Sequence, residues 1–382
     1  MDPFLAYARA KQKDIIGLIR LLVECESPSG DTVALDRFVS LISDVVAPMA
    51  RIRIFRHGHM RAEFLLPGRK KSGQILALGH SDTVWPFGTL QGMPFRHSEG
   101  RLWGPGVLDM KSGLAFFVFA LRALRDLDIP VMRKVVLQLN ADEETGSETS
   151  RALTEEAAKK SDCVLVLEPG TGLEGKLKTA RKGVGAYRIA VRGRASHAGV
   201  DFEAGASAIV ELARQIERVA GFTELERGIT VNPGVISGGT RSNVVAAEAG
   251  AEVDIRIARL KDAPALDRKF RALRPFDKRC AIKITGGLNR PPMERSRRIG
   301  ELFGIARRLA REIGIELEES ATGGGSDGNF TAALGVPTLD GLGGVGEGAH
   351  ATHESILVDR IADRTALLAK LIASQAKPCN MV

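Results

Sequence analysis

The sequence has few aromatic residues and no long apolar run. Phe, Trp and Tyr together make up 5% of its 382 residues, and no pattern typical of RNA-binding or helix-turn-helix domains is present. The longest apolar stretch, residues 114–121, is far shorter than the roughly 20 residues that cross a bilayer as a helix. The N-terminal residues also lack the apolar segment of a secretory signal. We therefore expect a cytoplasmic protein that does not enter a membrane.

The sequence also lacks paired cysteines and any concentrated block of one charge. Its four thiols form no Cys-x-x-Cys pair, which argues against a disulfide framework. Cys163 lies in the apolar run 163–167, so we expect it to be buried. The net charge of +8 is spread along the chain among acidic residues, which favours a solvated basic surface over a nucleic-acid site. A contribution of this charge to the capture of anionic substrates is the second interpretation. The cysteines are Cys25, Cys163, Cys280 and Cys379.

The length and the order of predicted elements indicate two domains, because 382 residues exceed what one hydrophobic core usually supports. In the first part, apolar runs alternate with helical patterns, which predicts a mostly parallel sheet flanked by helices. From about residue 185 the predicted order is β-α-β-β-α-β, typical of a ferredoxin-like α+β domain. The first pattern resumes after Pro292. We therefore expect an α/β domain formed by residues 1–180 and 293–382, with an insertion at 181–292.

Imidazole and carboxylate groups follow the predicted strands of the α/β domain. His80, Glu143 and Glu144, and Glu168 come directly after apolar runs. Each alone would be unremarkable, since a lone His is usually structural and adjacent Glu residues usually face solvent. Because ligands gather beyond the carboxyl ends of parallel strands, we expect these side chains to meet at one edge. Hard carboxylates and imidazoles in one place indicate a site for two divalent metal ions.

Asp109 is the expected bridge between the two ions, because its Gly-rich approach lets the backbone come close to them. Neighbouring side chains at a strand end point in different directions, so one of Glu143 and Glu144 can bind metal while the other acts as general base. Asp82, two residues after His80, is expected to hold the second ring nitrogen of that histidine. Glu354, four residues after His350, could hold the His350 ring in the same way.

Seven ordered motifs give the chain its resemblance to a known family. The chain resembles the M20 family of co-catalytic zinc peptidases and deacylases, and most strongly its glutamate carboxypeptidase (carboxypeptidase G2-like) branch. The resemblance covers nearly the whole chain and implies a zinc-exopeptidase-like α/β fold in which residues 181–292 form a lid and dimerisation domain. The motifs lie at residues 80–86, 106–113, 142–147, 168–169, 195–199, 323–329 and 350–354.

The resemblance also implies the metal ligands. His80 and Glu168 would hold one Zn²⁺ ion, Glu144 and His350 the other, and Asp109 would bridge them, with Co²⁺ or Mn²⁺ as substitutes. Glu143 would be the general base. In this family the bridging Asp is usually followed by a non-proline cis peptide, here Asp109–Met110.

Further residues are implied to contact the substrate. His197 would reach the active site of a partner subunit in a homodimer and stabilise the oxyanion. Arg290 or Arg256 would bind the carboxylate of an amino acid, because a guanidinium binds carboxylates through two hydrogen bonds. Asn243 and Gly325 complete this set of substrate-binding residues.

Several alternatives stay open at this point. The expected reaction is hydrolysis of an amide bond of an N-acyl amino acid or of a C-terminal amino acid in a short peptide. The alternative is a deacylase of the acetylornithine, succinyl-diaminopimelate or aminoacylase type, although residues 85–89 favour the carboxypeptidase branch. A metal-dependent binding protein without activity is a third possibility, against which the intact Glu143 argues. His353 offers a second imidazole beside His350. The G-x-G-x-x-G pattern at residues 341–346 precedes no predicted helix, so a loop that carries His350 explains it better than a nucleotide site.

Overall fold

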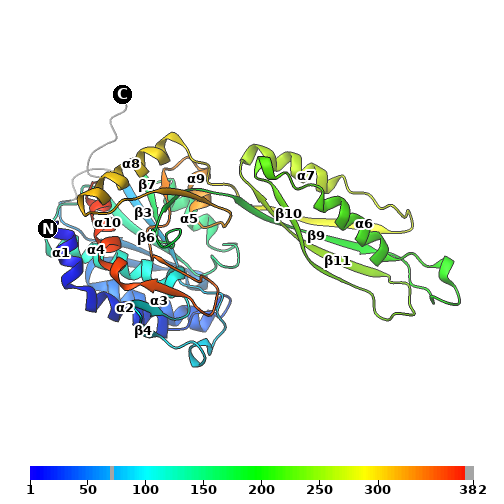
Figure 1. Ribbon diagram of the computed structural model, residues 1–382, viewed down its shortest axis with the longest axis horizontal. Coiled ribbons are helices and arrows are strands. Elements are labelled where there is room, and N and C mark those ends of the chain that lie inside the picture. Colours follow the sequence, from blue (N-terminus) through cyan, green and yellow to red (C-terminus); the bar gives the residue numbers. More distant parts are fainter. Residues whose placement is uncertain (69–72, 375–382) are drawn as a thin grey trace. The chain divides into compact units, whose positions relative to one another are not determined.

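The computed structural model describes residues 1–68 and 73–374, which separate into two compact units (Figure 1). Unit 1 comprises Met1–Ala180, Arg295–Ala321 and the chain from Ser326 onward, and unit 2 comprises Arg181–Glu294 and Thr322–Gly325. The short segment Thr322–Gly325 therefore belongs with the insertion rather than with the sequence that surrounds it. Cys379 lies outside the described residues. Within the described residues, no helix is long and apolar enough to cross a membrane, and the expected cytoplasmic location stays a prediction.

A six-stranded sheet forms the centre of unit 1. Its strand order is β1-β2-β6-β3-β7-β14. The four strands from β6 to β14 run parallel, whereas β1 and β2 form an antiparallel edge. The expected mixed α/β fold with a largely parallel sheet is confirmed. The strands are β1 (Ala50–Ile54), β2 (Met60–Phe64), β3 (Gln74–His80), β6 (Lys134–Asn140), β7 (Cys163–Val166) and β14 (Thr338–Leu339).

Both faces of this sheet are covered, which explains why its inner strands are apolar throughout. All seven residues of β3 are buried. Ile75 and Ala77 pack in the large core that includes helices α4 and α10, and Leu76 and Leu78 pack on the opposite face with Ala157 of α5. Helices α4 and α10 lie side by side (Figure 1). The helices of unit 1 are α1 (Pro3–Ala10), α2 (Gln12–Glu24), α3 (Thr32–Val46), α4 (Ser112–Asp126), α5 (Arg151–Ala158), α8 (Arg297–Glu312), α9 (Gly328–Ala333) and α10 (Ile361–Ser374).

A small antiparallel sheet joins two distant loops of unit 1. Its strand order is β15-β16-β5-β4, and Ser355 of β16 pairs with Trp103 of β5. Because these two strands are antiparallel, the residues that precede Ser355 lie beside those that follow Trp103. The loops that carry His350 and Asp109 are thereby brought together. The remaining strands of unit 1 are β4 (Arg96–Ser98), β5 (Arg101–Trp103), β8 (Leu177–Arg181, the last residue of which belongs to unit 2), β13 (Glu319–Thr322, likewise), β15 (Gly346–Glu347) and β16 (Ser355–Leu357).

Unit 2 has the expected β-α-β-β-α-β order and an antiparallel sheet. The strand order β10-β11-β9-β12 leaves β10 at one edge. Tyr187 stacks on Phe270 with ring centroids 3.8 Å apart, inside a core that both helices share with the sheet. The elements are β9 (Gly183–Arg192), α6 (Ala208–Ala220), β10 (Thr230–Gly238), β11 (Glu248–Ile257), α7 (Ala263–Arg271) and β12 (Ala281–Arg290).

Candidate metal centre

The parallel strands β3, β6 and β7 end at one edge of the central sheet, and the predicted ligands follow them there. His80 is the last residue of β3 and pairs with Asn140 at the end of β6. Glu144 follows β6 by four residues, and Glu168 follows β7 by two. The sheet therefore brings these side chains together, as expected for a parallel sheet.

Two groups of three side chains are spaced so that each could hold a metal ion. In the first, His80 Nε2 lies 3.1 Å from Asp109 Oδ1 and 3.6 Å from Glu168 Oε1. In the second, His350 Nε2 lies 3.2 Å from Glu144 Oε1 and 3.6 Å from Asp109 Oδ2. We call these the His80 triad and the His350 triad. The second imidazole is much more open, because its side chain is 47% exposed and that of His80 only 2%.

Asp109 belongs to both triads and turns one carboxylate oxygen toward each. It lies in the turn Val107–Lys111, and the peptide bond between Asp109 and Met110 is cis, as expected. This is the arrangement that a carboxylate bridging two ions requires. Asp109 is thus the geometric centre of the site.

The pKa shifts in the two triads are consistent with the binding of a cation. Burial alone would raise the pKa of Asp109, but its interactions with His350 and His80 outweigh burial and hold that pKa well below the usual range. The carboxylates of Asp109 and Glu144 raise the pKa of His350 to about 10. The Glu144 oxygen nearest to His350 is buried and lies 3.2 Å from the His350 Nε2 atom. Divalent ions would replace the protons that these groups share, because metal binding and protonation compete for the same lone pairs.

Asp82 supports the site in a way that differs partly from the expectation. The His80 Nδ1 atom lies 2.8 Å from the backbone carbonyl oxygen of Asp82 and 3.5 Å from its carboxylate. The two carboxylate oxygens accept hydrogen bonds from the backbone N–H groups of Glu143 and Glu144, at 3.1 and 3.2 Å, and one also accepts from Ser29 Oγ. Asp82 therefore fixes the turn that carries these two glutamates. Glu143 itself belongs to neither triad.

The prediction that Glu354 holds the His350 ring is wrong. Both oxygens of the Glu354 carboxylate instead accept hydrogen bonds from the Asp109 loop and from Trp85. Of the two candidate imidazoles in this segment, His350 lies in a triad and His353 does not. Three of the glycines of residues 341–346 lie in the connection between β14 and β15, and Gly346 begins β15. A Cβ at Gly343 would lie 2.2 Å from the carbonyl oxygen of Leu167.

The remaining predicted site residues lie in unit 2. His197 and Asn243 are exposed neighbours, because the backbone of Ala198 donates to the carbonyl of Asn243. Arg290 is buried at the end of β12 and packs against Gly325. A Cβ atom added to Gly325 would lie 2.9 Å from the Arg290 Cδ atom. Arg256 is engaged by Asp254 through two hydrogen bonds of 2.9 and 2.8 Å.

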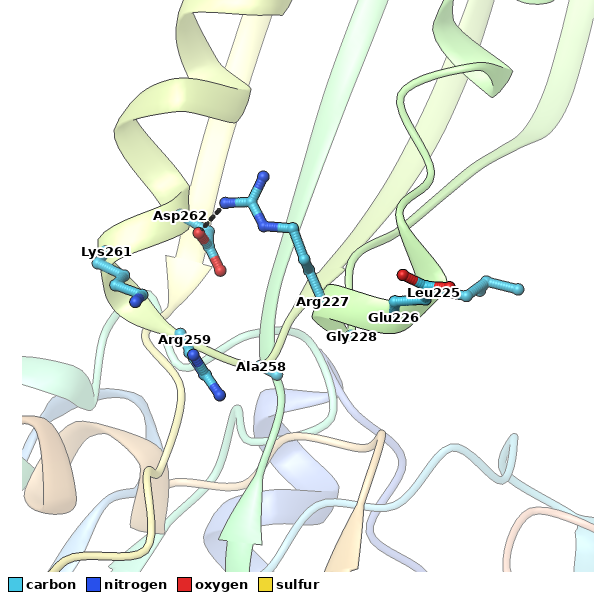
Figure 2. A pocket seen from close by; sticks show the side chains of 8 residues that line it. All are labelled: Leu225, Glu226, Arg227, Gly228, Ala258, Arg259, Lys261 and Asp262. Atoms are coloured by element: carbon cyan, nitrogen blue, oxygen red, sulfur yellow. Dashed lines mark hydrogen bonds and ion pairs between the residues drawn. The ribbon is translucent and has the colours of Figure 1, made fainter.

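Unit 2 also has a surface hollow of about 380 Å³, shown in Figure 2. Its one buried carboxylate, Asp262, is paired with Arg227. No imidazole or thiol lines it. The hollow therefore lacks the groups of a metal or nucleophile site, and the two triads of unit 1 are the better candidate centre.

Comparison with known proteins supports a peptidase family. The model of "Peptidase family M20/M25/M40" matches residues 76–374. Carboxypeptidase G2 of Pseudomonas sp. (strain RS-16) is 31% identical over 302 residues, which cover 78% of this chain and 73% of the relative. Acetylornithine deacetylase of Klebsiella pneumoniae (strain 342) is 34% identical over 201 residues, which cover 48% of this chain and 50% of that protein.

Solved structures share the fold at low identity. Aminopeptidase PepT from Bacillus cereus superimposes with a TM-score of 0.77 at 23% identity, over 96% of this chain and 99% of that chain. The M20 family metallo-carboxypeptidase Sso-CP2 from Sulfolobus solfataricus superimposes with a TM-score of 0.74 at 16% identity, over 94% of this chain and 98% of that chain.

Proposed function

Because the chain belongs to the M20/M25/M40 peptidase family and is therefore a hydrolytic, metal-dependent enzyme, we propose that it is a two-zinc hydrolase of amide bonds next to an amino acid. Its substrates are N-acyl amino acids or short peptides that end in the released amino acid. The observation that carries this proposal is the position of Asp109 between the two triads, with one oxygen toward each. Co²⁺ and Mn²⁺ are expected substitutes for Zn²⁺.

In the proposed mechanism, His80 and Glu168 would hold one ion and Glu144 and His350 the other, with Asp109 as a ligand shared by both. Two divalent ions bound there supply polarisation of the amide carbonyl and activation of water. Glu143 accepts the proton of the attacking water and then gives it to the leaving amine. Asp82 keeps Glu143 in place through the backbone, because it binds the N–H group of that residue.

Two arginines of unit 2 compete for the role of binding the substrate carboxylate. Arg256 already has Asp254 as a bidentate partner, which lowers its capacity for a second carboxylate. Arg290, buried beside Gly325, and Arg256 are both kept as candidates for this role, with Asn243 as a further polar contact. Acetylornithine deacetylase as a relative keeps the deacylase alternative open.

The test is hydrolysis of a substrate panel by metal-stripped protein with and without added Zn²⁺. The panel contains N-acyl-glutamates, N-acetylornithine, N-succinyl-diaminopimelate and apolar N-acyl amino acids. We expect zinc-dependent release of an amino acid, with glutamate favoured. Release of ornithine or diaminopimelate instead would select the deacylase alternative. Two bound metal ions without turnover of any member of the panel would refute the proposed substrate class.

We further propose that unit 2 forms a homodimer through β10 and that His197 acts in the partner's active site. As an edge strand, β10 presents unpaired backbone groups together with Val235 and Ile236, whose exposed fractions are 57% and 59%. Val210 of α6 is exposed as well. Val235→Lys should yield a monomer in light scattering and a large loss of turnover, because the monomer offers His197 no partner active site to enter. A fully active monomer would refute the shared site.

His197→Ala tests the catalytic half of this idea. We expect the variant to fold and dimerise but to turn over slowly, because the oxyanion loses one stabilising group; such a loss typically costs about 10²–10³-fold in kcat. Normal turnover would remove His197 from the mechanism.

A further inference from the structure

Glu354 is a fully buried carboxylate between the two loops that carry Asp109 and His350. Its side chain is 0% exposed. Oε2 accepts hydrogen bonds from Trp85 Nε1 and from the Gly106 backbone N–H, both at 2.9 Å. Oε1 accepts from the N–H groups of Leu108 and Asp109, at 2.9 and 3.0 Å. Each oxygen therefore has two donors, three of which belong to the backbone that leads into Asp109.

The strand pairing explains why Glu354 reaches that backbone. Ser355 pairs with Trp103, so the residue before Ser355 lies opposite the loop that follows Trp103. The Gly104 N–H donates to the backbone carbonyl of Glu354 at 3.4 Å. Glu354 is also only four residues from His350. One side chain thus connects the bridging carboxylate of the proposed metal site with the loop of a ligand in the His350 triad.

We propose that Glu354 is a positioning residue that holds the Asp109 and His350 loops in register and thereby sets the affinity of the His350 triad for its metal ion. This role rests on the proposed two-metal function. The four hydrogen bonds of the Glu354 carboxylate go to Trp85 and to backbone N–H groups, one of which is that of Asp109 itself. A buried carboxylate is tolerated when hydrogen bonds offset its desolvation, and the four donors offset part of it here. Outer groups that orient metal ligands typically contribute about 10–100-fold to metal affinity.

Glutamine is not a conservative replacement at this position. Each carboxylate oxygen accepts two hydrogen bonds, whereas the NH₂ group of glutamine can accept none. Whichever way the amide is turned, two donors face another donor. With the NH₂ group at the Oε2 position, these two are the N–H groups of Trp85 and Gly106. Removal of the Trp85 donor should therefore restore part of the Zn²⁺ affinity that Glu354→Gln loses.

The experiment is titration of metal-stripped protein with Zn²⁺ in competition with a chromophoric chelator, which resolves the affinity of each ion without using activity. We assign the weaker ion to the His350 triad, because the His350 side chain is 47% exposed and that of His80 only 2%. In Glu354→Gln we expect this weaker ion to lose about 10–100-fold in affinity, while the stronger ion changes less. Trp85→Phe alone should lower the affinity for the same ion about threefold, since it removes one hydrogen bond. In the Glu354→Gln background, the same Trp85→Phe change should leave the Zn²⁺ affinity unchanged or raise it. Glu347→Gln is the control, because Glu347 begins the same loop, has a side chain 51% exposed and pairs with Arg101.

The outcomes separate this role from the proposed function. Two ions bound with unchanged affinity by Glu354→Gln would overturn the role of Glu354 and leave the two-metal proposal intact. If Glu354→Gln does not fold, an unchanged Zn²⁺ affinity in Trp85→Phe would overturn the role of Glu354 instead. Wild-type protein that binds fewer than two ions would refute the proposed function, and the role of Glu354 with it.

Discussion

Replacement of Arg364 by methionine should destabilise unit 1 far more than replacement of an exposed arginine. The Arg364 side chain is 1% exposed, and its guanidinium donates to three backbone carbonyls. Nε donates to Gly343 at 3.1 Å, Nη1 donates to Gly175 at 2.9 Å, and Nη2 donates to Gly341. Burial lowers the pKa of Arg364 to about 10, which still leaves it protonated at neutral pH. The guanidinium therefore joins α10 to two loops as a buried cation.

The magnitude follows from the groups that the substitution leaves behind. A buried acceptor without its donor costs about 1–3 kcal/mol, and three carbonyls lose a donor here. Methionine removes the cost of burying a charge, which offsets part of this loss. We therefore expect the free energy of unfolding to fall by about 3 kcal/mol. In Arg364→Lys the free energy of unfolding should fall by less, because the ammonium group can replace some of the three hydrogen bonds.

Urea unfolding followed by tryptophan fluorescence measures this change in the correct unit, because both tryptophans, Trp85 and Trp103, belong to unit 1. Arg297→Met is the matched control. Its side chain is 86% exposed and pairs with Glu301 four residues along the same helix, an interaction worth about 0.3–0.5 kcal/mol. A loss below about 1 kcal/mol in Arg364→Met, with an unchanged slope against urea, would refute the reasoning.

Three further predictions test the site and the core. Glu143→Ala should retain both metal ions in a chelator titration and lose about 10²–10⁴-fold in kcat, whereas loss of an ion would make Glu143 a ligand. Gly343→Ala should lower the unfolding free energy by about 1–3 kcal/mol, because its Cβ would lie 2.2 Å from the Leu167 carbonyl oxygen; Gly304→Ala, in open space on α8, should not lower it. Burial raises the pKa of Cys163 to about 12, so its thiol should stay protonated and unreactive toward a disulfide reagent at pH 8–9 until urea is added; labelling of Cys163 itself in the native protein, located by peptide mapping, would contradict this.

The apolar strands of the central sheet could be predicted from the sequence because both of their faces are buried. The run before His80 and the run that contains Cys163 are strands β3 and β7, and Cys163 is buried as expected. The positions of the carboxylates followed from these strand ends. This inference needs only the rule that parallel strands place their carboxyl ends at one edge.

Other features depend on contacts that local pattern does not encode. The β4, β5, β15 and β16 sheet escaped prediction because its strands have only two or three residues, too few for a visible alternation. The role of Glu354 was misjudged for a related reason. Its spacing from His350 suggested a partner four residues away, but Glu354 lies outside any helix, and the pairing of β16 with β5 turns its side chain to a different loop.

The distribution of the two triads along the chain has a consequence for biosynthesis. His80, Asp109 and Glu168 all precede the insertion that forms most of unit 2, whereas His350 follows it. A nascent chain therefore carries every member of the His80 triad long before the ribosome has made the last member of the His350 triad. The strand β14 that completes the sheet beside β7 is also synthesised late. The His350 triad, in contrast, cannot form before the last part of the chain has been synthesised.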